Sequence, residues 1–400
     1  MLCRARWGAR SCFIAILCLL SACRMGHGDR PGRDGFAVDH DPEPTSVHIA
    51  AAFGPDGNLW RIAAGRRHVY VDRSADLGNT FGPPVEVNRE PQGIKVDSEN
   101  RPDITVDRRG RIYVSYTAEG QQPTTLYVSV STDGGHTFSA PIPASDQAAH
   151  ASSFQGRIRR SPDDRVYLFW HDERDRAGNR DTGNALYFTT LDGESGIVSP
   201  ARKAADMQCE CCRLAVDFDA DGHPIVLSRF IYPGDIRDHG LIKSEADGKT
   251  WRSTRVTFDD WEFVGCPEHG PALAIDGSGR YHIAWFTLGD QRQGLFYANS
   301  SDQGQHFSTP MPIGNLKRQA GHPDLLVLGA RVFLTWREFD GGNTQIMLMR
   351  SSDSGKRWTE PESLAQTAER ADNPFLVTDG HRVFLSWNSR DRGYRLIPID

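Results

Sequence analysis

Four cysteines in the middle of the sequence offer the strongest local chemistry. They are Cys209, Cys211, Cys212 and Cys266, and His269 follows the last of them. In an oxidising compartment, four thiols that lie close together most often form disulfides, for example between Cys266 and one of the first three. Thiolates beside an imidazole would also suit a soft ion such as Cu(I) or Zn(II), although Cys-x-Cys-Cys is not a standard zinc spacing. The sequence therefore predicts disulfides first and a thiolate metal site second.

A repeated turn motif surrounds these residues along the chain. The pattern Ser-x-Asp-x-Gly-x-x-aromatic has four intact copies, whose acidic residues are Asp76, Asp133, Asp302 and Asp353. A worn copy runs from Ser244 to Trp251, and a further trace lies at Thr189 to Gly193. The Asp side chain can accept hydrogen bonds from the backbone N–H groups that follow it, and the Gly supplies a positive φ. The aromatic ring can then be buried between neighbouring sheets.

The copies recur about every 50 to 60 residues, a period that indicates a propeller or solenoid array. Seven segments fit the second strand of such a unit: Leu59 to Ala63, Ile112 to Tyr116, Val166 to Trp170, Ile225 to Arg229, Tyr281 to Trp285, Val332 to Trp336 and Val383 to Trp387. The sequence thus predicts a single all-β domain over residues 43–400, a β-propeller of seven blades, with six as the alternative. The last unit has room for only three strands, so we expect a stretch around Phe36 to Val38 to close the ring.

The repeated turn resembles the Asp-box, also called the BNR repeat, of the sialidase (neuraminidase) superfamily of β-propellers. The resemblance covers nearly the whole chain after the N-terminal segment, and the typical catalytic domain of that superfamily has six blades. It implies that the box aspartates brace the blades on the face away from the active site. The four mid-chain cysteines then fall on two adjacent loops at the opposite end. Their pattern resembles that of bacterial sialidase-like lipoproteins.

Sialidases of this superfamily hold the substrate carboxylate with three arginines and use a Tyr, activated by a Glu, as the nucleophile. The resemblance implies that arginines on the loops away from the boxes take the first role. The candidates are Arg213, Arg229 and Arg337, with Tyr394 as the nucleophile and Glu338 as its partner. Arg229 stands out because the aligned residues of most other units are aromatic. The family's Arg-Ile-Pro signature is absent, and none of these candidates matches the family residue by residue.

The N-terminus has the features of a bacterial lipoprotein signal. Residues 1–22 contain arginines before an apolar run that is too short to span a membrane, and Leu20-Ser21-Ala22-Cys23 resembles a lipobox. We expect cleavage before Cys23, lipidation of its thiol, and residues 23–42 as a tether. The mature protein would then lie in the bacterial cell envelope and touch a membrane only through its lipid anchor.

Charge and composition limit the partners. A formal net charge of −6 without a basic stripe argues against nucleic acid. The sequence has no cofactor signature, and we expect no cofactor. Three functions stay open: a sialidase-type glycosidase acting on an anionic glycan, a non-catalytic propeller that binds a glycan or protein through disulfide-braced loops, and a thiolate Cu or Zn site. The first function predicts that Arg213, Arg229 and Arg337 converge in one central pocket.

Overall fold

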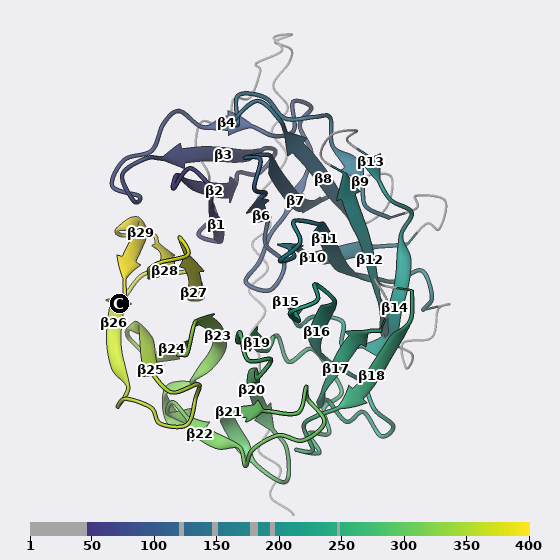
Figure 1. The fold of residues 1–400 in the computed structure, drawn as a ribbon, viewed down its shortest axis with the longest axis vertical. Coiled ribbons are helices and arrows are strands. Elements are labelled where there is room, and N and C mark those ends of the chain that lie inside the picture. Colours follow the sequence, from purple (N-terminus) through teal and green to yellow (C-terminus); the bar gives the residue numbers. More distant parts are fainter. Residues whose placement is uncertain (1–45, 120–123, 146–150, 177–182, 193–196, 246–248) are drawn as a thin grey trace, which may run out of the picture. The chain divides into compact units, whose positions relative to one another are not determined.

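The computed structural model describes residues 46–119, 124–145, 151–176, 183–192, 197–245 and 249–400. These residues form seven antiparallel sheets arranged as the blades of a ring (Figure 1). The predicted seven-bladed β-propeller is therefore confirmed. The expected signal peptide, the tether with Cys23 and the closing stretch Phe36 to Val38 lie outside the described residues. Within the described ranges, the chain contains no helix that is long and apolar enough to cross a membrane.

The first three blades differ in their number of strands. The first contains β1 (Ile49–Phe53), β2 (Leu59–Ala64), β3 (Val69–Ser74) and β4 (Val85–Glu86). The second contains β5 (Ile94–Lys95), β6 (Asp103–Val106), β7 (Ile112–Ala118), β8 (Thr125–Ser131) and β9 (Ile142–Pro143). The third contains β10 (Ser153–Arg160), β11 (Val166–Asp172), β12 (Asn184–Asp192), β13 (Ile197–Val198) and β14 (Arg202–Gln208).

The remaining blades are more regular. The fourth contains β15 (Ala215–Phe218), β16 (Pro224–Arg229), β17 (His239–Ser244) and β18 (Trp251–Arg255). The fifth contains β19 (Ala272–Ile275), β20 (Tyr281–Leu288), β21 (Gln293–Ser300) and β22 (Met311–Ile313), and the short 3-10 helix η3 (Leu316–Arg318) follows it. The sixth contains β23 (Gly321–Leu328), β24 (Arg331–Phe339), β25 (Thr344–Ser351) and β26 (Glu362–Thr367). The seventh contains β27 (Phe375–Thr378), β28 (Val383–Ser389) and β29 (Gly393–Pro398).

The second strand of each blade forms the core. Every residue of β7, β11 and β28 is buried. A blade packs against a neighbour on each face, so this strand has no solvent-facing side, and its sequence is mostly apolar rather than alternating. Four tryptophans share one position near the end of this strand and are at most 2% exposed: Trp170, Trp285, Trp336 and Trp387. They pack the blades together, as their repeated spacing predicts.

The intact Ser-x-Asp-x-Gly motifs, here called Ser-Asp turns, close the third strand of four blades. In one of them, Ser131 Oγ accepts a hydrogen bond from the Gly135 N–H at 3.0 Å, and Asp133 Oδ1 accepts one from the Thr137 N–H at 3.0 Å. Gly135 has φ +81°, a conformation that favours glycine. The other three turns repeat these bonds, so the hydrogen bonding of the turn is contained within one short segment.

The first and last blades are joined by a buried carboxylate rather than by a fourth strand among the described residues. Asp372 accepts hydrogen bonds from the Ile49 N–H at 3.0 Å and from the Arg101 guanidinium, and lies 3.0 Å from His48 Nδ1. Asn388 also donates to the Val47 carbonyl at 3.0 Å. These contacts link β1 and β27 across the junction of the ring.

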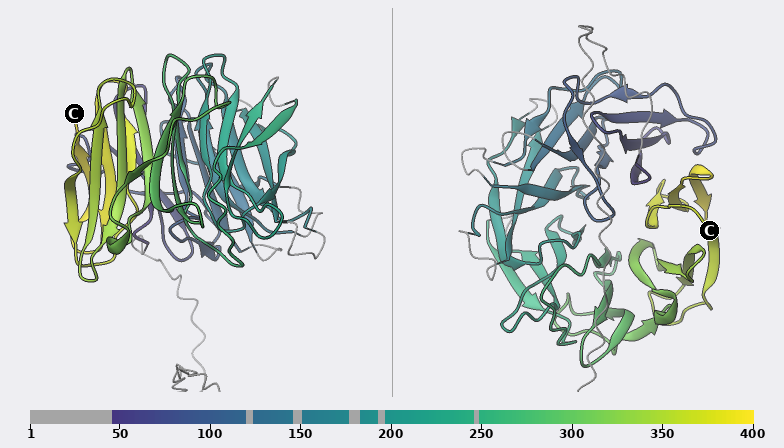
Figure 2. Two further views of the ribbon diagram at one scale, coloured as in Figure 1. Left: turned by 90° about the horizontal axis from the view of Figure 1, so that it is seen from below. Right: turned by 180° about the vertical axis from the view of Figure 1, so that it is seen from behind.

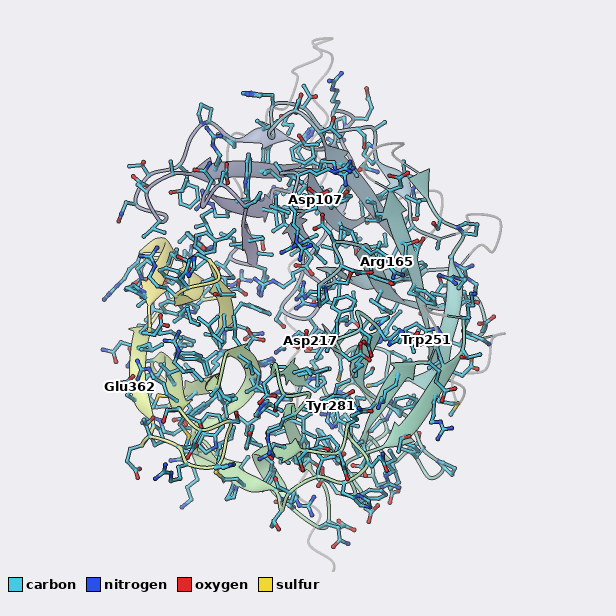
Figure 3. All side chains as sticks on the ribbon, viewed as in Figure 1. Asp107, Arg165, Asp217, Trp251, Tyr281 and Glu362 are labelled. Atoms are coloured by element: carbon cyan, nitrogen blue, oxygen red, sulfur yellow. The ribbon has the colours of Figure 1, made fainter. Side chains whose placement is uncertain are left out.

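The blades present two different faces. The strands run between these faces, as the side view in Figure 2 shows. Because the strands are antiparallel, each inner strand ends on the face that carries the Ser-Asp turns, here called the turn face. The segments that lead into the inner strands lie on the opposite face, here called the loop face. Asp217, on the inner strand β15, lies near the axis of the ring, whereas Glu362 lies at its outer rim (Figure 3).

Candidate functional site

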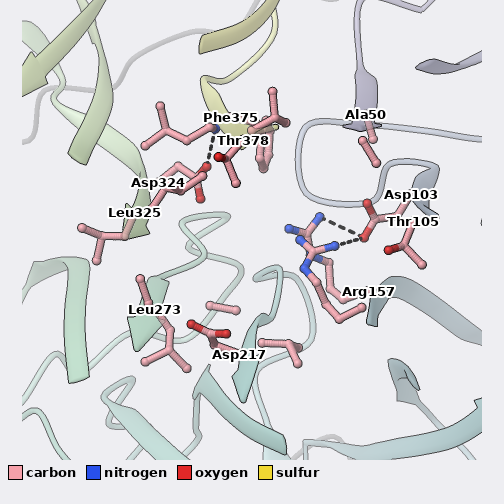
Figure 4. A pocket seen from close by; sticks show the side chains of 18 of the residues that line it. Ala50, Asp103, Thr105, Arg157, Asp217, Leu273, Asp324, Leu325, Phe375 and Thr378 are labelled. Carbon is pink, nitrogen blue, oxygen red and sulfur yellow. Dashed lines mark hydrogen bonds and ion pairs between the residues drawn. The ribbon is translucent and has the colours of Figure 1, made fainter. Parts of the chain in front are cut away.

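A cavity of about 460 Å³ lies on the axis of the ring, and the inner strands of all seven blades line it. Such a volume is within the range of small-ligand pockets. Its lining includes five arginines, namely Arg101, Arg157, Arg159, Arg160 and Arg213, and three aspartates, namely Asp103, Asp217 and Asp324. Figure 4 shows the Arg157 side chain directed at the Asp103 carboxylate. The cavity is therefore polar and rich in guanidinium groups.

Three of these arginines surround one aromatic ring. The guanidinium carbons of Arg101, Arg157 and Arg213 lie 4.0, 5.8 and 5.5 Å from the centre of the Phe375 ring. Each comes from a different blade, and each is at most 7% exposed. Guanidinium groups match carboxylate and sulfate oxygens with paired N–H donors. This group, here called the arginine cluster, has the chemistry of an anion site.

Three carboxylates hold the arginine cluster: Asp103 lines the cavity, whereas Glu99 and Asp372 do not. Arg101 pairs with Asp372, Arg157 Nη1 lies 3.5 Å from Asp103 Oδ2, and Arg213 Nη1 lies 3.1 Å from Glu99 Oε1. Among the described residues, three buried donors still have no hydrogen-bond partner: Arg101 Nε and Nη1, and Arg157 Nε. Buried polar groups are nearly always paired, so these donors are free to meet an anionic ligand.

The charges in the cavity act on one another. Burial, together with the neighbouring Arg159, lowers the pKa of Arg157 to about 9. An anion beside Arg157 would reverse this penalty, because an opposite charge favours the charged form. Burial raises the pKa of Asp217 to about 6 and also raises the pKa of Asp324. The cavity thus combines guanidinium groups that keep unpaired N–H donors with carboxyl groups that hold protons more tightly than usual.

Glu99 binds four blades together at the loop-face end of the cavity. Its Oε2 accepts hydrogen bonds from the Arg213 N–H at 2.8 Å and the Gly270 N–H at 2.9 Å, and its Oε1 lies 3.1 Å from His322 Nδ1. Burial alone would raise the pKa of Glu99, but Arg213 and His322 outweigh it and lower this pKa to about 2. Glu99 is therefore an ionised, fully buried anchor.

Exposure along the cavity shows where it opens. Arg101, Arg157 and Arg213, at the loop-face end, are buried, whereas the side chains of Arg159 and Arg160 are 31% and 35% exposed. Residues 157, 159 and 160 run along β10 towards the turn face. The arginines therefore form a series that leads from solvent at the turn face to the buried cluster.

The structure does not bring Arg213, Arg229 and Arg337 into one pocket. Only Arg213 lines the cavity. Arg229 replaces the packing aromatic of β16 and donates to the carbonyls of Arg237 at 2.6 Å and Phe286 at 2.8 Å, which ties adjacent loops together. Arg337 is half-buried on β24, and burial lowers its pKa. The expected convergence fails because Arg229 and Arg337 lie on the second strands β16 and β24, outside the inner strands that line the cavity.

Tyr394 and Glu338 also lie away from the arginine cluster. The Tyr394 ring packs between the last and first blades, 5.6 Å from the Phe81 ring, and burial raises the pKa of its hydroxyl to about 12, which opposes a nucleophilic role. Glu338 Oε1 accepts hydrogen bonds from Trp336 Nε1 and from the Asn315 N–H, both at 3.0 Å. Glu338 therefore anchors a packing tryptophan, as Asp172 does for Trp170.

Sequence reasoning missed Arg101, Arg157, Glu99 and Phe375. One signal was available, because residues i and i+2 of a strand share a face, and Arg157 and Arg159 alternate on an inner strand whose counterparts are mostly apolar. Phe375 carries no comparable signal, and Glu99 lies in a charged run with Asp97 and Arg101 that is typical of an exposed loop. Both residues contact side chains from other blades, so their roles follow only from how the blades meet at the axis of the ring.

The cysteines lie on the loop face, beside the fourth and fifth blades. All four are free thiols in the structure, so the predicted disulfides are not present. Cys209 and Cys212 are buried, Cys211 is half-buried, and Cys266 is exposed. Hydrogen bonds with the Cys211 and Cys212 thiols lower the pKa of Cys209, and the charges of Arg229 and Arg237 lower it further. His269 does not take part in this group of thiols. Its ring centre lies 4.1 Å from that of Phe286, on which it stacks, and 4.6 Å from that of His322, near Glu99.

Comparisons with known proteins show the fold and little more. No protein-family model matches the chain, and no curated protein matches it. An ulvan lyase of polysaccharide lyase family PL25, solved with -[GlcA(1-4)Rha3S]- bound, is similar with a TM-score of 0.60 and 12% identity, covering 89% of this chain and 94% of that one. The polysaccharide lyase Uly1 gives a TM-score of 0.59 at 10% identity over 90% of this chain and 91% of its own.

A Hadza microbial sialidase, Hz136, gives a TM-score of 0.49 at 15% identity, covering 86% of this chain and 74% of that one. The chain thus shares its propeller fold with the two polysaccharide lyases. At these identities the likeness is one of fold, so the function has to be argued from the site itself.

Proposed function

We propose that this protein acts on an anionic glycan, and that a carboxylate or sulfate group of the glycan binds to Arg101, Arg157 and Arg213 in the central cavity. The observation that carries this proposal is the convergence of these three buried guanidinium groups on Phe375. Their unpartnered donors supply hydrogen bonds that no described residue accepts. The similar ulvan lyase binds a ligand that contains GlcA, which agrees with an acidic sugar.

Hydrolysis of a sialic acid linkage, by a pair of carboxyl groups in place of the Tyr and Glu that sialidases use, is the finer form of this proposal. Glycosidases use a pair of carboxyl groups, one of which must be protonated as the general acid. Asp217 and Asp324 both line the cavity, and burial raises the pKa of Asp217 to about 6, so it is the better proton donor near neutral pH. In this version Tyr394 and Glu338 have packing roles and take no part in the reaction.

Calorimetric titration with sialic acid and with a GlcA-containing oligosaccharide tests the binding step. We expect Arg157→Ala to raise the Kd about 10- to 100-fold, because a hydrogen bond to a charged group contributes about 1.5–3 kcal/mol. Arg252→Ala is the matched control, since its side chain is 74% exposed on the outer strand β18. Equal affinities of the wild type and Arg157→Ala, or binding of neutral sugars alone, would refute the anion site.

Turnover separates the two functional classes. Release of the fluorophore from a fluorogenic sialoside, lost in Asp217→Asn, would support a glycosidase, and formation of an unsaturated uronate would indicate a lyase. Binding without any turnover would support a non-catalytic glycan-binding propeller, which is the second candidate. That candidate is favoured by one observation, namely that every arginine of the cluster already has a carboxylate partner.

The cell-envelope location is likewise a proposal. It rests on the lipobox-like Leu20-Ser21-Ala22-Cys23 and on the arginines and short apolar run within residues 1–22. Under it, the lipid at Cys23 and the tether of residues 23–42 hold the propeller near a membrane. Mass spectrometry of the mature protein tests it, because a chain that starts elsewhere than at a lipidated Cys23 would contradict it.

A further inference from the structure

The cysteine cluster of the loop face brings four thiols together from two loops. The Sγ atoms of Cys209, Cys211 and Cys212 all lie within 4.8 Å of one another, and those of Cys209 and Cys212 are 3.8 Å apart. Cys266, from the loop before β19, interacts with the Cys211 thiol. The turn is fixed to its blade, because the Cys209 N–H donates to the Arg229 carbonyl at 2.8 Å.

This spacing suits a shared metal ion. Two thiolates bound to a tetrahedral Zn(II) with bonds of about 2.3 Å have sulfur atoms about 3.8 Å apart, whereas a disulfide brings them to about 2.05 Å. The observed separation of Cys209 and Cys212 equals the first value. Thiolate donors are also the ligands that soft ions such as Zn(II) and Cu(I) prefer.

Buried cations surround the cluster. Arg237 Nη1 donates to Cys209 Sγ at 3.6 Å, and Arg229 stands where most other blades have an aromatic ring. Both arginines are at most 4% exposed. A site made of several thiolates stays anionic after it binds Zn(II) or Cu(I), so nearby guanidinium groups and N–H···S bonds stabilise it. This role explains why Arg229 replaces the aromatic residue that most other blades have at this position.

A buried imidazole beside the cluster lacks partners. His171 is fully buried, and neither of its ring nitrogens has a hydrogen-bond partner in the part of the chain that the structure describes. The ring lies close enough to Cys209 to interact with it. A polar ring of this kind is rarely left unpaired, so the set of free thiols and imidazole is incomplete by itself.

An acidic cavity gives cations access to the thiols. It has a volume of about 310 Å³ and opens on the loop face, where Cys211 lines it together with Asp97, Glu99, Glu210 and Glu268. A concave surface with several carboxylates concentrates cations. The path from solvent therefore leads to the half-buried Cys211 and the exposed Cys266 before the buried pair.

We propose that Cys209, Cys211, Cys212 and Cys266 bind one thiophilic d10 ion, Zn(II) or Cu(I), on the loop face. The site joins the loops of the fourth and fifth blades and is separate from the arginine cluster. It needs the thiols in their reduced form. It does not depend on the glycan function proposed above.

Metal content of the full chain, purified under reducing conditions, tests the proposal. After exposure to Zn(II), or to Cu(I) held by a chromophoric chelator, native mass spectrometry is expected to show one ion per chain. X-ray absorption is expected to show metal–sulfur distances of about 2.3 Å. Competition between the two ions then identifies the preferred one.

Variants decide whether these residues are the ligands. Cys211→Ser and Cys266→Ser, at the two solvent-accessible positions, are expected to lose the ion to the chelator, and Arg237→Ala to weaken binding about 10- to 100-fold. The matched control is His223→Ala, because Asp219, Asp221 and His223 form the other group of possible ligands among the described residues. The thermal midpoint of each variant shows that it is folded. Folded, reduced protein that takes up neither ion would overturn the proposal, as would cysteine variants that bind like the wild type or an ion lost in His223→Ala.

Discussion

The two faces of the propeller use polar side chains over very different distances along the chain. On the turn face, Ser131 and Asp133 bond to groups two to four residues away. On the loop face, Glu99 bonds to residues that are 114, 171 and 223 positions away. Local bonds of the first kind can repeat wherever the motif repeats, whereas bonds of the second kind exist once, where particular blades meet.

This difference separates scaffold from chemistry. The Ser-Asp turns are alike, and they hold each blade in the same way. The arginine cluster and the cysteine cluster both depend on residues that interrupt the repeat, such as Arg157 on β10 and Arg229 on β16. A propeller of this kind gains its specific chemistry where a blade departs from its neighbours.

Loss of the Glu99 charge is expected to have the largest effect on stability. Glu99→Gln keeps the shape of the side chain but leaves Arg213 buried without its counter-charge. Breaking one side of a buried ion pair costs about 3–5 kcal/mol, so we expect the free energy of unfolding to fall by that amount at pH 7. Urea denaturation followed by tryptophan fluorescence measures it.

The pH dependence of this loss tests its cause. The pKa of Glu99 falls from 4.5 to about 2 on folding, which corresponds to about 3 kcal/mol of stability. A carboxyl group whose pKa is lowered contributes this stability above the unfolded pKa and loses it as the pH falls towards 2. The difference between the wild type and Glu99→Gln should therefore shrink below pH 4.5. A difference that stays constant down to pH 3 would show that packing, and not charge, is responsible.

The fold could be predicted because its information is local. Seven second strands of similar length and four turns with fixed spacing identify a blade without any knowledge of its neighbours. The closing contact could not be predicted in the same way. Asp372 joins the last blade to β1 through Ile49, and nothing near Asp372 in the sequence marks it as different from other loop aspartates.

The site was predicted less well for the same reason. Arg213 was found because it adjoins the cysteines, but Arg101 and Arg157 reach the Phe375 ring from two other blades. Tyr394 and Glu338 were chosen by chemical type, although the pair Trp170 and Asp172 repeats the arrangement of Trp336 and Glu338 and could have identified the packing role. Aligning the repeats at every polar position would have removed Glu338 from the candidates.

Two adjacent glycines of one Ser-Asp turn separate its local backbone geometry from its packing against the neighbouring blade. A Cβ on Gly135 would lie 2.4 Å from the Trp60 ring and would sit at φ +81°, whereas one on Gly134, at φ +69°, would meet nothing within 4 Å. Other turns already hold side chains at the position of Gly134, for example Leu77 at φ 58° and Gln303 at φ 60°.

We therefore expect unequal costs for the two substitutions. Gly134→Ala should cost about 1 kcal/mol for the left-handed backbone, and Gly135→Ala about 2–4 kcal/mol because it adds the clash with the Trp60 ring. The shift of the urea midpoint at constant slope measures both. Equal shifts would mean that the turn moves freely relative to the neighbouring strand, so that the Trp60 contact does not constrain it.

A further small effect concerns a single serine of the turn face. Ser300 Oγ accepts the hydrogen bond of the buried Gly304 N–H at 2.8 Å, so Ser300→Ala leaves that donor without its acceptor. The cost of such an unsatisfied group is about 1–2 kcal/mol. Ser308→Ala is the matched control eight residues along, because Ser308 Oγ accepts the Asn299 N–H at 3.1 Å in an exposed position, where water can replace it and the change should stay within about 0.5 kcal/mol. If the two variants were equally stable, burial of the turn would not matter to its strength. A loss at Ser300 as large as that at Glu99 would mean that the turn face, too, depends on contacts between blades, and the contrast between the two faces would no longer hold.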